Sequence, residues 1–174
     1  MNRWFVLLGC LVAVPAFFVL AGRSPDPERF GVSLAASTVS GWRTRDVPHL
    51  IIRCEAHKTE AYVVTGVSAQ PEAGELGKHT VRLRFDDHQQ EREIWDQSAD
   101  DRALFSQSPV RFVKKVARSK TLTFEFTPFQ AGPAVATFSV AGFDRRLPAL
   151  RRCADGRPSP VTQQGAPASD QVDH

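Results

Sequence analysis

The sequence has few cysteines, and none of them stands in the Cys-x-x-Cys spacing of redox-active dithiols: only three occur in 174 residues. The lack of this motif argues against a thiol–disulfide exchange enzyme. Long runs of one charge are also missing, because 22 lysines and arginines are interleaved with 19 aspartates and glutamates. Nucleic-acid-binding proteins carry a clustered basic footprint, so we expect no nucleic-acid partner. Internal repeats are lacking as well, and no set of nucleophile, base and acid stands out as a catalytic site.

An apolar leader opens the chain. Met-Asn-Arg precedes an apolar run from Trp4 to Ala21. A short basic region, an apolar region and small residues at its end are typical of a secretory signal, so residues 1–21 predict export with cleavage after Ala21. The run is also near the lower length limit of a membrane-spanning helix, and residues 4–21 as an uncleaved inner-membrane tether are the alternative. Cys10 is interpreted as a small apolar residue of this run, not as a lipidation site.

The rest of the chain has room for one domain between two polar segments. Residues 22–30 are expected to be a linker, because Pro25 and Pro27 together exclude a helix or a central strand. The domain is expected over residues 31–153. Residues 154–174 contain almost no large apolar side chains, so they cannot offset their ordering entropy and are predicted to form a disordered tail. Export places this domain in the periplasm or beyond it.

Alternating apolar and polar residues predict a mainly β domain. In the segment 120–127, for example, Leu122, Phe124 and Phe126 share one face. Strands are expected at 31–36, 49–55, 60–67, 80–85, 90–95, 120–127 and 134–141. The fold class that we predict is an antiparallel sheet or β-sandwich with two short helices and one disulfide.

The two helices are predicted near the C-terminal end of the domain. Ser108 followed by Pro109 marks a helix start, with Ser108 as its cap. A second helical segment opens at Gly142 and ends near Cys153. In an oxidising compartment an isolated cysteine pair is most simply a disulfide, so Cys54 and Cys153 are expected to join the second helix to a strand.

Three groups of polar residues are candidates for a catalytic or metal-binding site. Asp86, Asp87 and His88 could ligate a metal, but turns favour aspartate for backbone reasons. Ser98 with nearby acids has no local histidine as a base, so a capped turn is the preferred interpretation. The remaining candidates are scattered histidines, which would have to converge to hold a metal: His49, His57, His79 and His88. We therefore expect no catalytic residue, no metal and no cofactor.

Aromatic and basic side chains complete the candidates. Expected core or fold-supporting aromatics are Trp42, Trp95, Phe105, Phe124, Phe126, Phe129, Phe138 and Phe143. The candidate interaction surface is one basic helix face, made of Arg111, Lys114, Lys115 and Arg118. Such a face is usually only solvated, but in an envelope protein it can meet anionic lipid or an acidic partner.

Between residues 32 and 153, several positions follow a recognisable order. They are Leu50-Ile-Ile-Arg-Cys54, the strand from Val81 to Phe85 ending in Asp86, Trp95 with Ser98 and Asp100, Ala103, Phe105, Phe112, Leu122, Pro128, the segment Phe138-Ser-Val-Ala-Gly142-Phe143, and Cys153. In this order the chain resembles the VasI (EvfG-like) proteins associated with bacterial type VI secretion. The resemblance implies an exported protein with two cysteines and an accessory role, and it carries over no catalytic residue.

These observations favour an exported, non-enzymatic accessory or binding protein of the bacterial cell envelope, linked by the resemblance to type VI secretion. The expected partner is an envelope or secretion-apparatus protein. Two alternatives stay open: an envelope hydrolase using Ser98 with a distant histidine, and a periplasmic inhibitor or immunity-like binder.

Overall fold

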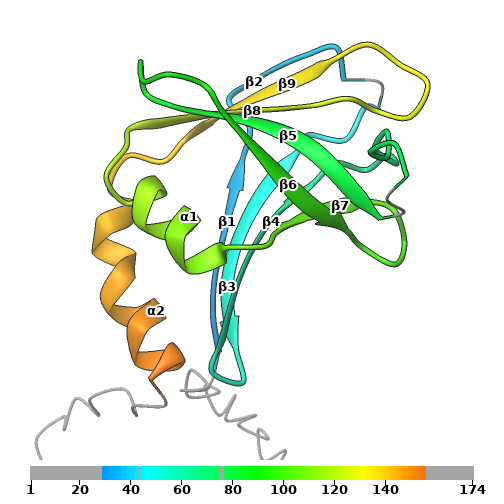
Figure 1. Cartoon of the computed structure of the whole chain (residues 1–174). Coiled ribbons are helices and arrows are strands. Elements are labelled where there is room, and N and C mark those ends of the chain that lie inside the picture. The colour runs from blue at the N-terminus through cyan, green and yellow to red at the C-terminus, as the bar shows by residue number, and fades with distance from the viewer. Residues whose placement is uncertain (1–28, 43, 75–76, 156–174) are drawn as a thin grey trace, which may run out of the picture.

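The computed structural model describes residues 29–42, 44–74 and 77–155 (Figure 1). The expected signal or tether, nearly all of the expected linker and the expected tail lie outside these residues. Among the helices that are described, none is long and apolar enough to cross a membrane.

The described chain forms one curled antiparallel sheet of nine strands in the order β1-β3-β4-β7-β6-β5-β8-β9-β2. The strands are β1 (Arg29–Ala35), β2 (Thr38–Ser40), β3 (His49–Glu55), β4 (Lys58–Val64), β5 (Lys78–Phe85), β6 (Glu91–Gln97), β7 (Ala103–Ser106), β8 (Thr121–Phe126) and β9 (Ala134–Ser139). Every strand pairing is antiparallel. The predicted mainly β class is confirmed, in the form of a single sheet.

Several element boundaries differ from those the sequence pattern predicts. β1 begins at Arg29, two residues before the expected domain start, because Arg29 and Phe30 pair with the end of β3. β2 and β7 were not expected, since strands of three and four residues are too short to display an alternation. The predicted four-residue turn before β4 is instead a two-residue turn, in which Ala56 and His57 both adopt positive φ. Hairpin turns of this kind usually carry asparagine and glycine, which are lacking here.

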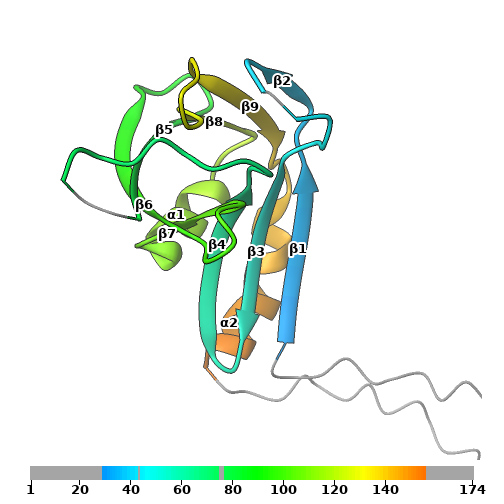
Figure 2. The same cartoon turned by 90° about the vertical axis from the view of Figure 1, so that its right-hand side faces the viewer.

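The N-terminal strands close the curl of the sheet. β1 pairs with β3, and after a bend β2 pairs with β9 at the other end of the strand order (Figure 2). Within the bend, the amide of Ala36 donates to the carbonyl of Pro48, and that of Ser37 donates to the carbonyl of Thr137. One segment of chain therefore bridges the two sides of the sheet.

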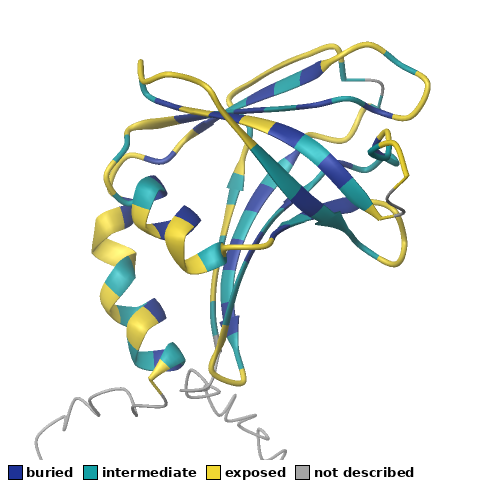
Figure 3. Cartoon of the chain, in the orientation of Figure 1, coloured by how far each residue is buried: buried dark blue, intermediate teal, exposed yellow. Residues whose placement is uncertain are grey.

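The core lies inside the curl, where buried positions alternate with exposed ones along the strands (Figure 3). Trp95 is fully buried, with ring centroids 5.3 Å from Phe112 and 5.4 Å from Phe124. Helix α1 (Pro109–Val116), the 3-10 turn η1 (Phe143–Arg146) and helix α2 (Leu147–Ala154) follow in chain order. α1 contacts β4, and α2 contacts β1, β3 and β4, so the helices cover the inner side of these strands (Figure 1).

One aromatic expectation needs correction, that for Phe129. Phe129, expected in the core, is 51% exposed because it follows Pro128 in the turn after β8 and only its amide is engaged, by Ser68. Phe105 is half-buried on the outer face of the sheet, where its ring stacks on Tyr62 at 4.4 Å. The other expected aromatics are buried or half-buried; Trp42 contacts the edge of Phe126.

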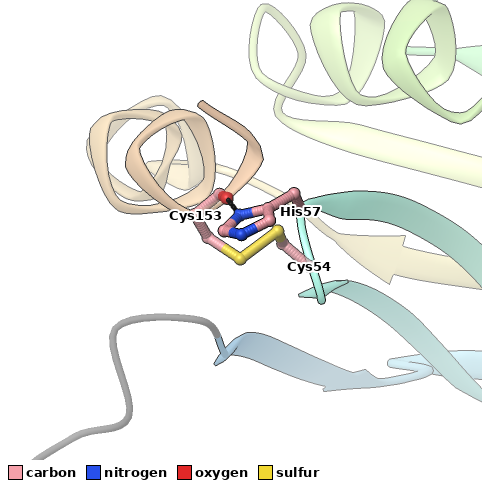
Figure 4. Close-up of a disulfide and its surroundings, with 3 residues drawn as sticks. All are labelled: Cys54, His57 and Cys153. Atoms are coloured by element: carbon pink, nitrogen blue, oxygen red, sulfur yellow. Dashed lines mark hydrogen bonds between the residues drawn. A yellow bond between two sulfur atoms is a disulfide. The ribbon is translucent and has the colours of Figure 1, made fainter. Parts of the chain in front are cut away.

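The disulfide Cys54–Cys153 joins β3 to α2, as the sequence predicts (Figure 4). Its Cα atoms lie 6.1 Å apart and the two cysteines are 99 positions apart in sequence. His57, in the β3–β4 turn, adds a hydrogen bond of 2.8 Å between Nδ1 and the carbonyl of Cys153. The last turn of α2 is thus held to the β3–β4 hairpin by one covalent bond and one polar contact.

Candidate functional site

The predicted basic face lies on α1 and the residues that follow it. The buried side of α1 consists of Phe112, Val113 and Val116, which leaves the lysines and arginines outside. Pro109 stands in the first turn as expected, but Ser108 makes no side-chain cap hydrogen bond. The helix is therefore positioned by its apolar side and by the contacts of its basic residues.

Two members of the basic face are neutralised by strand β6. Arg111 Nη2 lies 3.4 Å from Glu93 Oε1, and Lys115 is paired with Glu91 and lies 4.0 Å from Glu93. The ammonium of Lys115 also lies 5.6 Å from the centre of the Phe85 ring. Exposed pairs of this kind contribute little individually, but together they attach α1 to the edge of the β5–β6 hairpin.

The other two members, Lys114 and Arg118, are exposed and make no ion pair within the described residues. The structure thus divides the predicted surface into a structural half and a solvent-facing half. Sequence spacing could not reveal this division, because the neutralising glutamates belong to a strand that precedes the helix by some 20 positions.

A groove lies beside Lys114, between α1 and α2. It encloses a cavity of about 280 Å³ with a predominantly apolar lining. Its lining residues are Thr59, Val110, Val113, Lys114, Leu147, Leu150, Arg151, Ala154 and Asp155. Val110 has the helical spacing of the buried Val113, which predicts that it is buried as well, but it is 55% exposed and lines this groove. The spacing of α1 predicts an apolar stripe, but not that one end of it remains uncovered.

Asp86, one of the metal candidates, accepts hydrogen bonds from backbone amides. It adopts a positive φ, and its Oδ1 accepts hydrogen bonds of 2.8 Å from the amides of both Lys120 and Thr121. These bonds, led by that from Thr121, lower the pKa of Asp86. His88 Nδ1 is bonded at 2.9 Å to the carbonyl of Phe85. In the described part of the chain, no three His, Cys, Asp or Glu side chains converge on a metal position.

Ser98 has the geometry of a turn residue. Its hydroxyl donates to Asp100 Oδ1 at 2.6 Å and accepts from the amides of Arg102 and Ala103 at 3.1 and 2.9 Å. The Ser98 hydroxyl is also the largest cause that lowers the pKa of Asp100. The oxygen of Ser98 is thus used to order the β6–β7 connection.

The histidines lie in separate places. His49 Nδ1 is bonded to the Ser33 hydroxyl at 3.0 Å, and His57 contacts Cys153 as described above. His79 is only 2% exposed; its Nδ1 is bonded at 2.9 Å to the carbonyl of Gln70, and its Nε2 has no partner within the described residues. These contacts fit structural roles at strand ends.

The fold and the surface define a class, which is a curled antiparallel β-sheet protein covered by two helices, one of them joined to the sheet by a disulfide. No family model matches this chain, and neither a curated protein nor a solved structure matches it. The resemblance to the VasI (EvfG-like) proteins therefore stays a prediction.

Proposed function

We propose that this protein is an exported accessory or binding protein of the bacterial cell envelope that acts without catalysis, through its two-helix cover. The observation that carries the proposal is the disulfide Cys54–Cys153, which holds α2 against β3. Disulfides between buried cysteines are typical of oxidising compartments, which fits the secretory leader. The same bond makes the cover a rigid surface, as a binding surface requires.

The solvent-facing chemistry of the cover supports a binding role. Lys114 and Arg118 are exposed and make no ion pair within the described residues, so they can pair with acidic groups of a protein partner. Such a surface fits an envelope or secretion-apparatus protein. The link to type VI secretion rests on the resemblance alone.

The test is a cross-linked pull-down of the full chain from native cell envelopes, read by non-reducing mass spectrometry. One preparation reports the mature N-terminus, the peptide containing Cys54–Cys153 and the proteins held by the cross-linker. The matched variants are Lys114→Glu with Arg118→Glu, and Arg84→Glu as a control on the exposed side of β5.

We expect the native chain and the Arg84→Glu control to recover the same envelope proteins. The variant Lys114→Glu with Arg118→Glu should not recover them. Recovery of secretion-apparatus components specifically would support the type VI link. A single, tightly bound enzyme would indicate the inhibitor or immunity-like alternative. The proposal would be contradicted if Cys54 and Cys153 were free thiols and the same proteins were recovered with the native chain and with both variants. The alternative of an envelope hydrolase that uses Ser98 would then be tested first.

A further inference from the structure

We propose that the groove between α1 and α2 binds one anionic phospholipid of a membrane surface, with part of an acyl chain on its apolar floor and the phosphate between Lys114 and Arg151. The inference rests on the proposed function, since an envelope location brings the groove beside a bilayer. It names a lipid, and not a protein, as the occupant of this part of the cover.

The first argument is the shape and chemistry of the groove. Its floor is aliphatic, formed by Val113, Leu147 and Leu150, and Val110 extends this apolar surface into solvent. A volume of about 280 Å³ lies just below the range of pockets that enclose a whole small ligand. It therefore suits part of a long apolar chain whose remainder stays in the bilayer.

The second argument is charge. Lys114 on α1 and Arg151 on α2 are both exposed and both line the groove, so a phosphate at its mouth is approached by a cation from each helix. One acid, Asp155, lines the groove at the end of α2. The wider cover is also basic. Apart from Arg111 and Lys115, which are paired with β6, its helical segments carry Lys114, Arg145, Arg146, Arg151 and Arg152 against Asp144 and the C-terminal Asp155 of α2. A surface of this sign is attracted to anionic lipid headgroups.

The third argument is the place of the groove in the molecule. Phe30 pairs with Cys54, and Cys54 is bonded to Cys153, so the start of β1 and the last turn of α2 lie at the same end of the molecule (Figure 2). Thr59, Ala154 and Asp155 line the groove at this end. If the leader is retained, which is the alternative to its cleavage, only residues 22–28 separate β1 from the tether at 4–21, and seven residues reach at most about 25 Å. A retained tether would keep the start of β1 within that distance of the bilayer, and the groove lies at the same end of the molecule.

The experiment compares two photoactivatable lipids on the full chain. The protein is reconstituted into phosphatidylcholine vesicles doped with either photoactivatable phosphatidylglycerol or photoactivatable phosphatidylcholine, which differ in headgroup charge. After illumination, the labelled peptides are mapped by mass spectrometry. The leader is the same in every variant, so the part of the phosphatidylglycerol excess that depends on Lys114 and Arg151 reports the groove.

We expect labels on the peptides that contain α1 and α2, with phosphatidylglycerol several-fold above phosphatidylcholine. The double variant Lys114→Glu with Arg151→Glu should remove this excess, whereas Arg84→Glu should keep it. Both changes concern exposed side chains, and an intact Cys54–Cys153 peptide verifies the fold in each sample.

Equal labelling of α1 and α2 by the two lipids, labels confined to other elements, or an excess that survives the double charge reversal would each overturn the lipid site. The envelope pull-down decides the proposed function separately. A protein partner recovered there without a phosphatidylglycerol preference here means that the groove belongs to that protein partner, and that only the lipid inference fails.

Discussion

Two aspartates in turns of this protein, Asp86 and Asp100, act as acceptors for backbone amides. Asp86 holds the start of β8 from the turn after β5, and Asp100 accepts from the amide of Arg102 at 3.2 Å. In both cases hydrogen bonds to the ionised form lower the pKa of the aspartate. Residues that look like a site of chemistry in the sequence therefore stabilise chain reversals.

Asp86 yields a prediction about acid stability. Because its pKa in the folded protein lies below the ordinary value of 3.8, its contribution is fully present above that value and is lost as the pH falls through the lower folded pKa. In Asp86→Asn this contribution is missing, so the free energy of unfolding should fall less steeply in acid than it does for the native chain. Urea unfolding followed by tryptophan fluorescence at a series of acidic pH values measures the difference. Parallel curves for the two proteins would contradict the assignment.

Ser98 yields a second prediction. Removing its hydroxyl in Ser98→Ala deletes three hydrogen bonds in the β6–β7 connection and leaves the Ala103 amide without its side-chain acceptor, while Arg102 and Asp100 keep their mutual bond. We expect the free energy of unfolding to fall by about 1 kcal/mol, the usual effect of losing such hydrogen bonds. Ser40→Ala is the control, since the Ser40 hydroxyl makes no hydrogen bond within the described residues. An unchanged stability, together with a lost envelope phenotype, would instead favour the hydrolase.

At the scale of elements, the disulfide decides where α2 lies. α2 is short, with eight residues, and only Leu150 and Cys153 of its side chains are buried. Isolated helices of this length are marginal in water. The covalent bond to β3 and the contact from His57 therefore do much of the positioning that a longer apolar face would otherwise do.

Removing this bond should therefore be costly. For the double variant Cys54→Ala with Cys153→Ala, we expect the free energy of unfolding to fall by about 4–5 kcal/mol, as the chain-entropy model gives for a loop of this length. Urea titration of the variant, with the reduced native protein as a control, measures the effect. A loss below about 1 kcal/mol would mean that packing alone holds α2.

At the scale of the whole molecule, the N-terminal bridge closes the sheet. Gly41 follows β2 and lies against β9, with a positive φ of 66°. A Cβ atom at this position would lie 2.2 Å from the carbonyl oxygen of Pro133. The closure thus depends on a residue without a side chain.

Gly41→Ala should accordingly weaken the closure. The left-handed backbone alone costs about 1–2 kcal/mol for alanine, and the clash with Pro133 adds to it. Gly132→Ala is the matched control, because a Cβ there meets nothing within 4 Å and its φ is not positive; its stability should change by less than about 0.5–1 kcal/mol. Thermal unfolding measures the stability of the two variants, and hydrogen exchange measures how well the β2 amides are protected in each. Equal stabilities would show that the bridge is not needed for closure.

Much of the fold follows from the sequence because local patterns decide it. The alternation in β3, β5 and β8 and the proline at the start of α1 depend only on neighbouring residues, and all of them are confirmed. β2 and β7 could not be predicted, because their short strands exist only through pairing with distant partners. Half of the candidate site could be predicted. The helical spacing of the lysines and arginines predicts the basic face, whereas no sequence pattern predicts the groove beside it.

The sequence by itself determined which faces of the strands are apolar, where the helices start and which two cysteines form the disulfide, because each is a matter of local periodicity or of cysteine number. Only the tertiary structure decided that the strands form one curled sheet, that Glu91 and Glu93 neutralise half of the basic face, and that Lys114 and Arg151 line the same apolar groove. These are contacts between segments far apart in the chain, and they arise from the packing of whole elements, which no local pattern encodes.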